Sequence, residues 1–431
     1  MRIVITILVL LLIAGGVGGL YLFSSRPEVK FEGDLKSIGQ ETPIRVRVHS
    51  GHGTKLVNAW IEQNGKRYPI FQNATASKSE QQDFAFPAGK KQAPELKDGP
   101  ARVIVQAKAN DFAGKTSEIA RDVTVMLAPP TVSADGFQHY VNQGGMELVT
   151  FTVSGSWNEA GVRVGKYTFR SFPLPGKGET ERFAMFAFPW DVPVDVVPVV
   201  YARNAAGTEA TARFWFKLFP RKFRVRELSL DDRFLTKVAN ELDAGGQGSL
   251  ADRFLRVNGE LRRKNNQQLA DLRDKSEQKV LWSGPFFRLG KVESFFADQR
   301  TYLYQGKKID QQMHLGFDLS DVQAAPVRAA NSGKVIHAGP LGIYGNCIVL
   351  DHGYGLQSIY GHMRQIDVKP GDMVTREQSM GKSGDTGLAG GDHLHFSMQI
   401  DGVQVNPIEW WDSHWIQDRI LSKLPARQEH A

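Results

Sequence analysis

Five residues in the C-terminal third of the chain have the side chains that could bind a metal ion and move protons. They are His314 and Asp318, His393 and His395, and His362 between the two pairs. Imidazole nitrogens and carboxylate oxygens bind zinc, and a catalytic zinc site leaves one coordination position open for water. Zinc lowers the pKa of that water to near 7, which gives a hydroxide nucleophile at neutral pH. The residue types therefore predict a zinc site with acid–base groups beside it.

The spacing of these residues indicates how they can converge. Gly316 lies between His314 and Asp318 and lets the backbone bend, so that both side chains can reach one ion. If His393 and His395 lie on a strand, their side chains point to the same face. One of these two histidines can then bind the metal while the other handles protons. Spacing alone does not decide which does which.

Other reactive residues in the same region receive no catalytic role. An isolated His-x-His or His-x-x-x-Asp pair occurs often by chance, so the combination carries the argument. His337 and His352 also lie in this region, and we expect His352 to be structural. Cys347, the single cysteine of the chain, lies in an apolar run and is expected to be a buried core residue rather than a nucleophile.

Length and composition bound the class of protein. A chain of 431 residues is long enough for about three domains of roughly 150 residues each. The hydrophobic share of 41% and charged share of 23% are typical of globular proteins and argue against wholesale disorder. The net charge of +7 is mild, so we expect no nucleic-acid partner. A cell-wall polymer or a membrane surface would suit this charge equally well.

The N-terminal segment is long and apolar enough to cross a membrane. Residues 3–23 carry no charge, and a helix of this length spans a hydrocarbon core about 30 Å thick. Arg2 precedes the run, and Tyr21 and Phe23 place aromatic rings near its far end. A cleavable signal peptide is the alternative, but its apolar core is usually shorter and a better cleavage site would follow. We expect residues 1–25 to be a signal anchor, single-pass in the cytoplasmic membrane, with the rest of the chain in the periplasm or extracellular space.

Residues 27–129 and 130–220 are each predicted to form a β-sandwich domain. Residues 44–48 alternate apolar and charged side chains, as a half-buried strand does. Residues 109–114 and 202–207 share Ala-x-(Asn/Asp)-x-Ala-Gly, 93 positions apart, each between two predicted strands. This repeat resembles bacterial immunoglobulin-like modules. Such domains could serve as a stalk or a wall-contacting arm, and a plain spacer is the simpler interpretation.

Residues 221–283 are predicted to form a short helical linker domain. Ser229 can cap one helix and Ser249 a second, each with apolar residues along one face. Residues 262–266 are polar all round, which is most simply a solvated face. Binding to an anionic polymer or lipid is the alternative for this run.

Residues 284–415 are predicted to form an all-β domain, followed by a tail over residues 416–431. Segments 333–338, 347–350 and 356–360 have the pattern of strands joined by tight, glycine-containing turns. No long helical pattern interrupts them, so the sheet should be mainly antiparallel. The expected fold class is therefore a mainly β, multidomain chain with an N-terminal transmembrane helix and a short helical linker.

The ordered motifs of this last domain resemble a known family. His-x-Gly-x-Asp, then Tyr-x-His, then Gly-Asp-His-x-His is similar to the M23 family of zinc metallopeptidases, the lysostaphin/LytM group. The resemblance covers roughly residues 284–411. It implies a compact antiparallel β domain with an open groove, which cuts peptide bonds in peptidoglycan. The upstream helices and residues 295–300 resemble membrane-anchored bacterial members, with Phe-Ala where Phe-Gly is commoner.

The resemblance also implies a role for each candidate residue. His314, Asp318 and His395 match the zinc ligands, with one Zn²⁺ per chain. His362 and His393 match the two histidines that orient water and stabilise the transition state. The division between ligand and catalyst thus rests on the resemblance and not on spacing.

Two functions from different classes follow. The first is a zinc endopeptidase that hydrolyses stem-peptide cross-links or bridges of peptidoglycan by attack of a zinc-bound water. The second is a non-hydrolytic LytM-type module that binds the wall and activates a separate amidase. Such modules typically lack one or more ligands, whereas this sequence lacks none, so we favour the enzyme.

Peptidoglycan and the membrane are the expected partners, and a regulatory protein is left open. Because the helices around residues 228–276 lie directly before the catalytic domain, they could cover its groove and keep the enzyme latent, with a plain spacer as the alternative.

Overall fold

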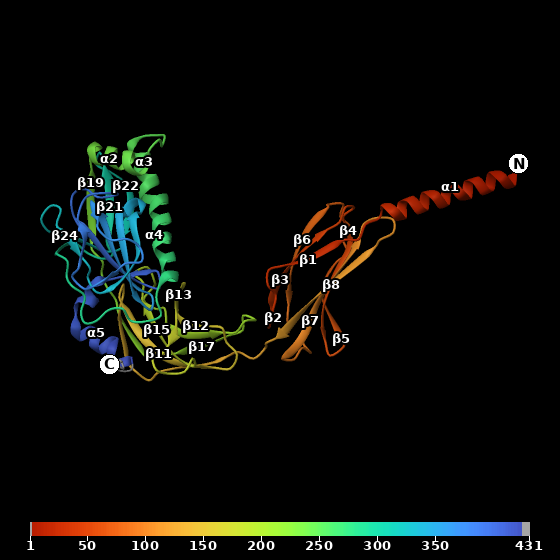
Figure 1. Cartoon of the computed structure of the whole chain (residues 1–431), viewed down its shortest axis with the longest axis horizontal. Helices are drawn as coiled ribbons and strands as arrows, with labels where there is room; N and C mark the ends of the chain where they lie inside the picture. The colour runs from red at the N-terminus through yellow and green to blue at the C-terminus, as the bar shows by residue number, and fades with distance from the viewer. Residues whose placement is uncertain (1, 425–431) are drawn as a thin grey trace. The chain divides into compact units, whose positions relative to one another are not determined.

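The computed structural model describes residues 2–424, and residues 425–431 of the predicted tail lie outside the described part (Figure 1). The prediction of a mainly β chain with an N-terminal apolar helix is confirmed. Its contacts define two compact units. The first is Met1–Thr131 with Ser154–Glu159 and Ala202–Ala210, and the second comprises Val132–Val153, Ala160–Tyr201 and Thr211–Ala431.

The N-terminal helix, α1 (Arg2–Phe23), contains a candidate membrane span. Residues Ile5–Phe23 have a mean hydropathy of 2.4, and the side chains described in this stretch are not buried within the protein. Length and composition alone support a membrane span, and a signal sequence near an N-terminus meets the same criteria.

Two sheets of the first unit enclose one hydrophobic core. Along β3 (Thr42–His49), Ile44, Val46 and Val48 are buried, while the residues between them are exposed. These side chains pack with buried residues of the second sheet, which makes a sandwich. The first sheet has the order β1 (Glu28–Glu32), β3, β6 (Gln81–Ala88), and the second β2 (Ser37–Ile38), β8 (Thr116–Val125), β7 (Gly99–Ala109), β4 (Thr54–Gln63), β5 (Lys66–Asn73).

Strands also occupy residues 131–219. Leu148, Val162 and Phe186 are fully buried between them. The division of residues 27–220 into two immunoglobulin-like domains stays a prediction. The sheets have the orders β14 (Phe172–Pro173), β15 (Glu181–Ala187), β11 (Met146–Ser154), β9 (Thr131–Ala134); β13 (Tyr167–Arg170), β12 (Glu159–Val164), β16 (Val199–Arg203), β17 (Glu209–Arg213); and β10 (His139–Asn142), β18 (Phe216–Phe219).

The segment before the first predicted helix differs from expectation. Ser229 does not cap a helix, because residues Val225–Leu230 form a strand, β19, that pairs in parallel with β21 (Asp298–Tyr304). Helix α2 (Asp232–Leu242) begins two residues later, where the side chain of Asp231 accepts a hydrogen bond from the amide of Phe234. β21 pairs in turn with β22 (Lys307–His314).

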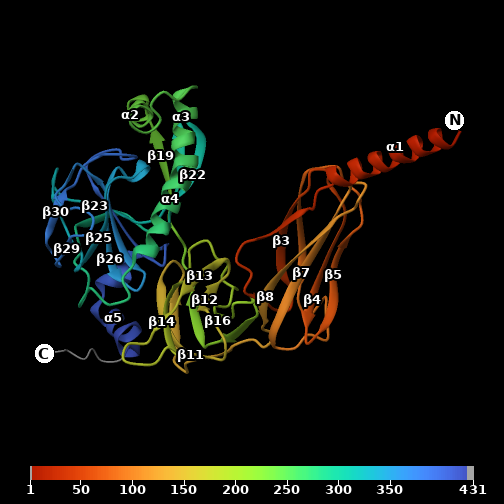
Figure 2. The same ribbon diagram turned by 45° about the vertical axis from the view of Figure 1, so that its right-hand side comes forward.

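The second predicted helix begins where the sequence indicated. Ser249 caps α3 (Leu250–Arg256) in a capping box with Asp252. A π-helical turn, η1 (Val257–Leu261), joins α3 to α4 (Arg262–Asp271), and a 3₁₀ turn, η2 (Leu272–Lys275), ends the run. Figure 2 shows α3 and α4 following one another beside β22.

These helices share one hydrophobic core with the C-terminal strands. Leu235 and Val238 of α2 and Phe254 of α3 are fully buried. They belong to the same buried cluster as Val349 and Ile359, which lie on strands of the C-terminal sheet. The helical segment is therefore packed into the fold that carries the candidate site, and removing it would expose this cluster to water.

The C-terminal sheet is antiparallel, as the sequence predicted. Tyr360, Phe396 and Trp410 are among the largest fully buried side chains, and Cys347 is buried as expected. The sheet has the order β20 (Lys291–Ser294), β23 (Phe317–Ser320), β31 (Leu394–Ile400), β27 (Leu356–Met363), β26 (Asn346–Gly353), β25 (Gly333–Pro340), β29 (Met373–Val374), with β32 (Val403–Val405) beside β31.

Smaller elements complete the second unit. A three-stranded sheet has the order β24 (Pro326–Arg328), β30 (Ser379–Lys382), β28 (Gln365–Ile366), and a 3₁₀ turn, η3 (Gly342–Tyr344), precedes β26. The chain continues through η4 (Pro407–Trp411), α5 (Ser413–Arg419) and η5 (Leu421–Lys423). The ammonium of Lys423 lies 2.8 Å from the carboxylate of Glu147, so the described end of the chain is held against β11.

Candidate metal centre

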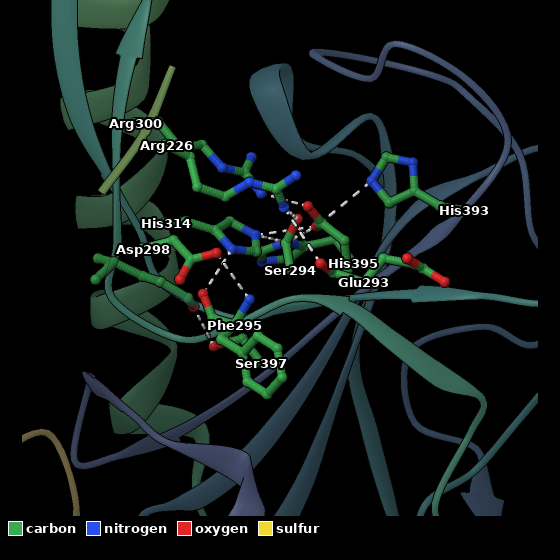
Figure 3. Close-up of polar contacts among 12 residues, drawn as sticks. Arg226, Glu293, Ser294, Phe295, Asp298, Arg300, His314, His393, His395 and Ser397 are labelled. Atoms are coloured by element: carbon green, nitrogen blue, oxygen red, sulfur yellow. Dashed lines mark hydrogen bonds and ion pairs between the residues drawn. The ribbon is translucent and has the colours of Figure 1, made fainter. Parts of the chain in front are cut away.

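Three of the five candidate residues place one ligand atom each in a single cluster. His314 ends β22, Asp318 lies on β23, and His395 lies on β31 directly opposite Asp318. Nε2 of His314 is 3.0 Å from Oδ1 of Asp318 and 3.1 Å from Nδ1 of His395. Nδ1 of His395 is 3.3 Å from the same Oδ1. Figure 3 shows the rings of His314 and His395 beside each other. The antiparallel register of β23 and β31 thus brings together residues that are far apart in the sequence.

The chemistry of this donor set fits zinc. Ligand atoms about 2.0–2.1 Å from a tetrahedral zinc ion lie roughly 3.3–3.4 Å from one another. The three separations, from 3.0 to 3.3 Å, are close to that edge length. Lone pairs that face each other at these distances repel unless a proton or a cation lies between them. Two imidazoles and one carboxylate therefore form a group that could hold a metal ion.

Gly316 is required for space at this cluster. A Cβ atom on Gly316 would lie 2.6 Å from Cε1 of His395 and 2.8 Å from the carbonyl oxygen of Phe396. Any larger residue would therefore push against the imidazole that completes the cluster. Glycine at this position thus leaves room for the imidazole of His395, in addition to letting the backbone bend.

A backbone hydrogen bond orients the first histidine. Nδ1 of His314 lies 3.1 Å from the carbonyl oxygen of Phe295, so Nδ1 carries the proton and Nε2 presents its lone pair to the cluster. His395 uses the opposite nitrogen, Nδ1, toward the cluster. Its Nε2 is buried and has no hydrogen-bond partner within residues 2–424.

The electrostatics keep the carboxylate ionised and the imidazoles neutral. Burial alone would raise the pKa of Asp318, but its interactions with His314, and then with the other two histidines, hold that pKa well below its usual value. Burial, opposed by Asp318, lowers the pKa of His314. Burial also lowers the pKa of His395 to about 4. These are the protonation states that metal binding requires.

Arg300 supports the carboxylate from the other side. Its guanidinium, on β21, donates a hydrogen bond to Oδ2 of Asp318, and only 19% of the Arg300 side chain is exposed. Asp318 therefore uses Oδ2 for Arg300 and Oδ1 for the cluster. Sequence reasoning did not single out Arg300, although it lies in the 295–300 run that was noted for its resemblance.

The other two candidate histidines border the cluster. The ring centroid of His362, at the end of β27, is 4.8 Å from that of His393 and 5.8 Å from that of His395. Nδ1 of His362 lies 2.8 Å from the carbonyl oxygen of Thr386. His362 has a φ of 63°, a strained value for a residue other than glycine, which its surroundings hold in place. Burial, with His393 and His395, lowers the pKa of His362 well below its usual value.

His393 lies just before β31 rather than on it. Its Nδ1 is 2.8 Å from the carbonyl oxygen of Gly391, and its Nε2 is 3.4 Å from Oδ1 of Asp318. Burial alone would lower the pKa of His393, but its hydrogen bond to Asp318 and the charge of that residue raise it. The structure thus brings all five predicted residues to one place, three in the cluster and two beside it.

The cluster lies in a groove of about 420 Å³. One wall comes from the segment that was predicted to be a linker, through Arg226 and Leu228 of β19 and Phe234 of α2. Arg262 and Asn266 of α4 and Tyr344 also line it. Arg262 and Asn266 belong to the polar run 262–266, which the sequence suggested is most simply a solvated face. The other wall residues were not predicted to line a groove, because no local motif marks them.

His352 and His337, the two other histidines noted in the sequence, lie outside the groove lining. His352 is buried between the hydroxyl of Ser358, at 2.7 Å, and the carbonyl oxygen of Ser332, at 2.8 Å, and burial lowers its pKa to about 4. Nε2 of His337 lies 3.3 Å from the carbonyl oxygen of Gly339. Both therefore have local hydrogen-bond partners, and the expectation that neither is catalytic stays a prediction.

The fold and the donor set define a β domain with a candidate metal centre in an open groove. Residues 312–407 match the sequence model of Peptidase family M23. The C-terminal part of the chain therefore contains an M23 peptidase domain.

The chain is similar over a short stretch to peptidases from bacteria. It is 34% identical over 97 residues to the DD-carboxypeptidase/endopeptidase Mpg of Neisseria meningitidis serogroup B, which covers 22% of each chain. It is 34% identical over 96 residues to the peptidoglycan DD-endopeptidase ShyA of Vibrio cholerae serotype O1, again 22% of each chain. The match thus spans about a fifth of the length of these relatives. A solved Pseudomonas aeruginosa chain assigned to peptidase M23 is 20% identical, with a TM-score of 0.38, over 63% of this chain and 94% of that one.

Proposed function

We propose that this chain is a zinc-dependent endopeptidase that hydrolyses peptide bonds of bacterial peptidoglycan, in stem-peptide cross-links or bridges. The observation that carries the proposal is the convergence of Nε2 of His314, Oδ1 of Asp318 and Nδ1 of His395 at separations that suit tetrahedral zinc. The names of the M23-type relatives support peptidoglycan as the substrate class.

His314, Asp318 and His395 would hold one zinc ion. The bound ion supplies Lewis acidity, which polarises the peptide carbonyl and lowers the pKa of a water molecule. Arg300 keeps the second oxygen of Asp318 engaged, so that the carboxylate presents one oxygen to the ion.

Hydrogen-bond geometry supports different roles for the two remaining histidines. His362 donates its Nδ1 proton to the carbonyl oxygen of Thr386, so its Nε2 has a lone pair that can accept a proton from water. His393 faces an acceptor with each nitrogen, the carbonyl oxygen of Gly391 and the carboxylate of Asp318. A histidine with two acceptors is a double donor, so we assign His393 to stabilising the oxyanion and His362 to orienting water.

The apolar helix α1 supports a location at the membrane. We propose that it anchors the chain by a single span in the cytoplasmic membrane, with the C-terminal domains in the periplasm or extracellular space. The peptidase domain would then face the wall. The intervening β domains would serve as a spacer, and a regulatory protein partner remains open.

Digestion of purified peptidoglycan by the zinc-loaded full chain in detergent tests the proposal. We expect new peptide termini that mass spectrometry can assign to one bond, with activity lost in His314→Ala and in a chelator. His337→Ala, outside the groove, is the matched control and should retain activity. No new termini from the wild-type chain would overturn the enzyme. Release of glycan strands only when a purified amidase is added would instead identify the non-hydrolytic activator.

A further inference from the structure

Arg226 lies one strand away from the candidate metal centre. β19 and β21 pair in parallel, and their register places Arg226 opposite Arg300. Neighbouring strands are about 4.8 Å apart, and paired residues point to the same face. Since Arg300 reaches Asp318 of the metal cluster, Arg226 presents its side chain beside the same cluster. Figure 3 shows the two side chains extending alongside each other toward His395, and Arg226 lines the groove.

The two arginines differ in their partners. Arg300 is largely buried and bound to a carboxylate. Arg226 is exposed, and its Nη1 donates to the carbonyl oxygen of Glu293 at 3.2 Å and to the hydroxyl of Ser294 at 3.1 Å. Both acceptors are neutral. Within residues 2–424, no carboxylate oxygen lies within 4.0 Å of an Arg226 nitrogen.

The acidic groups near Arg226 are already engaged. The carboxylate of Glu293 lies 3.0 Å from the ammonium of Lys291 and also accepts a hydrogen bond from Ser320. The carboxylate of Asp231, at the rim of the groove, caps α2. Arg226 therefore brings to the groove a positive charge that forms no ion pair within residues 2–424, although it attracts the carboxylate of Glu293 from beyond 4.0 Å. Its guanidinium also offers N–H donors besides the Nη1 group that contacts Glu293 and Ser294.

We propose that Arg226 binds a free α-carboxylate on the residue that supplies the leaving amine of the cleaved peptide bond. A planar guanidinium matches a carboxylate by two parallel hydrogen bonds. The residue on the carbonyl side uses its own α-carboxyl group in the bond, so a free α-carboxylate next to the bond must belong to the amine side. β19 and β21, which carry Arg226 and Arg300, are about 4.8 Å apart, and an extended peptide advances about 3.3 Å per residue. A carboxylate one to two residues from the cleaved bond would therefore be at a suitable distance to reach Arg226. The inference rests on the proposed peptidase function and names the substrate class of that site.

Two peptides that differ in one group test this specificity. In one, the residue on the leaving-amine side ends in a free α-carboxylate, and in the other that group is a carboxamide. We expect the zinc-loaded full chain to cleave the carboxylate peptide with a kcat/KM about 10–100 times higher, the range expected for a hydrogen bond to a charged group. In Arg226→Gln, kcat/KM should fall by that factor for the carboxylate peptide only. Unchanged cleavage of the carboxamide peptide shows that the variant is folded and active.

A matched variant separates local binding from long-range attraction. Arg263 on α4 is exposed and outside the groove lining, so Arg263→Gln removes the same charge without removing the proposed contact. It should retain the preference, and Arg226→Lys, which keeps the charge but loses the planar fork, should retain part of it. Equal loss in the Arg226 and Arg263 variants, or a wild-type chain that cleaves both peptides equally, overturns the inference. Cleavage of neither peptide by the wild-type chain overturns the peptidase function itself.

Discussion

Arg300 and Asp318 divide the two oxygens of one carboxylate between a structural and a metal-facing role. Arg300 donates a hydrogen bond to Oδ2, while Oδ1 faces the imidazoles of His314, His393 and His395. The arginine comes from β21 and the aspartate from β23, so two sheets cooperate at this point. A carboxylate held in this way presents its ligand oxygen in one fixed orientation, which lowers the entropy lost when a metal binds.

Loss of the Arg300 contact should weaken zinc binding. In Arg300→Gln, the carboxylate of Asp318 can rotate, and we expect the dissociation constant for zinc to rise by about 10–100-fold, as for other residues that orient a ligand. Competition with a chromophoric chelator measures this constant without reference to activity. Arg226→Gln is the matched control, because the side chain of Arg226 donates to Glu293 and Ser294 rather than to Asp318, and this variant should bind zinc as the wild type does. An unchanged zinc dissociation constant in Arg300→Gln would show that the hydrogen bond from Arg300 to Asp318 does not contribute to zinc binding.

Gly316 should tolerate no side chain. In Gly316→Ala, the new Cβ would lie 2.6 Å from the imidazole of His395 and 2.8 Å from a backbone oxygen, so His395 or its strand must shift. We expect a loss of stability of about 1–3 kcal/mol, the usual cost of overpacking, together with weaker zinc binding. Gly178→Ala is the control, since a Cβ there meets no atom within 4 Å. Equal melting temperatures and zinc affinities for the two variants would refute the crowding argument.

The proposed metal ligands could be predicted from the sequence, whereas the residues and strand pairings that position them could not. His314, Asp318 and His395 could be proposed because few side chains bind zinc and the motifs are short. Their meeting depends on the pairing of Asp318 with His395 across β23 and β31, which no local pattern specifies. The choice of Nδ1 in His395 and the partnership of Arg300 with Oδ2 depend on the same long-range packing.

The misplaced helix start has a related cause. Ser229 is a good N-cap by type, and apolar residues follow it at helical spacing. Residues 227–230 also alternate polar and apolar side chains in a way that suits a strand. The partner strand that decides between helix and strand lies about 70 residues later. Tertiary pairing therefore overrides a local capping signal, and Asp231 becomes the cap instead.

Glu409 should make the stability of the second unit depend on pH. Its carboxylate is buried and accepts hydrogen bonds from Asn142, at 2.8 Å, and from the amide of Met146, at 3.0 Å. Burial raises its pKa to about 7, from 4.5 in a model compound. A carboxyl group with a raised pKa takes up its proton more readily in the folded state, so its contribution is complete below pH 4.5 and is lost as the pH rises through 7.

The difference in unfolding free energy between wild type and Glu409→Gln isolates this group. We expect that difference to change by roughly 3 kcal/mol between pH 4.5 and pH 7.5, with the wild type losing stability as the pH rises. Denaturant unfolding of the zinc-free chain at several pH values measures it. Zinc must be absent, because its binding depends on pH as well. Parallel stability curves for the two proteins would contradict the raised pKa.

Helix α2 should support the active site rather than inhibit it. Lys237 donates hydrogen bonds to the carbonyl oxygens of Asp385 and, at 2.9 Å, of Ala389, while Glu241 accepts one from the amide of Gly387. The same loop supplies the carbonyl oxygen of Thr386 that orients His362. α2 therefore holds the loop that positions a proposed catalytic histidine.

Removing this contact decides between support and latency. In Lys237→Ala, the loop loses the hydrogen bonds from Lys237 but keeps the one to Glu241. We expect kcat on peptidoglycan fragments to fall several-fold with zinc affinity unchanged, because the metal ligands lie elsewhere. Lys264→Ala on the exposed face of α4 is the control and should keep wild-type kcat. If the helices instead cover the groove and keep the enzyme latent, loosening α2 should raise kcat. A fall in kcat with an unchanged zinc dissociation constant would indicate that α2 supports the active site. A rise in kcat would indicate that the helices keep the enzyme latent.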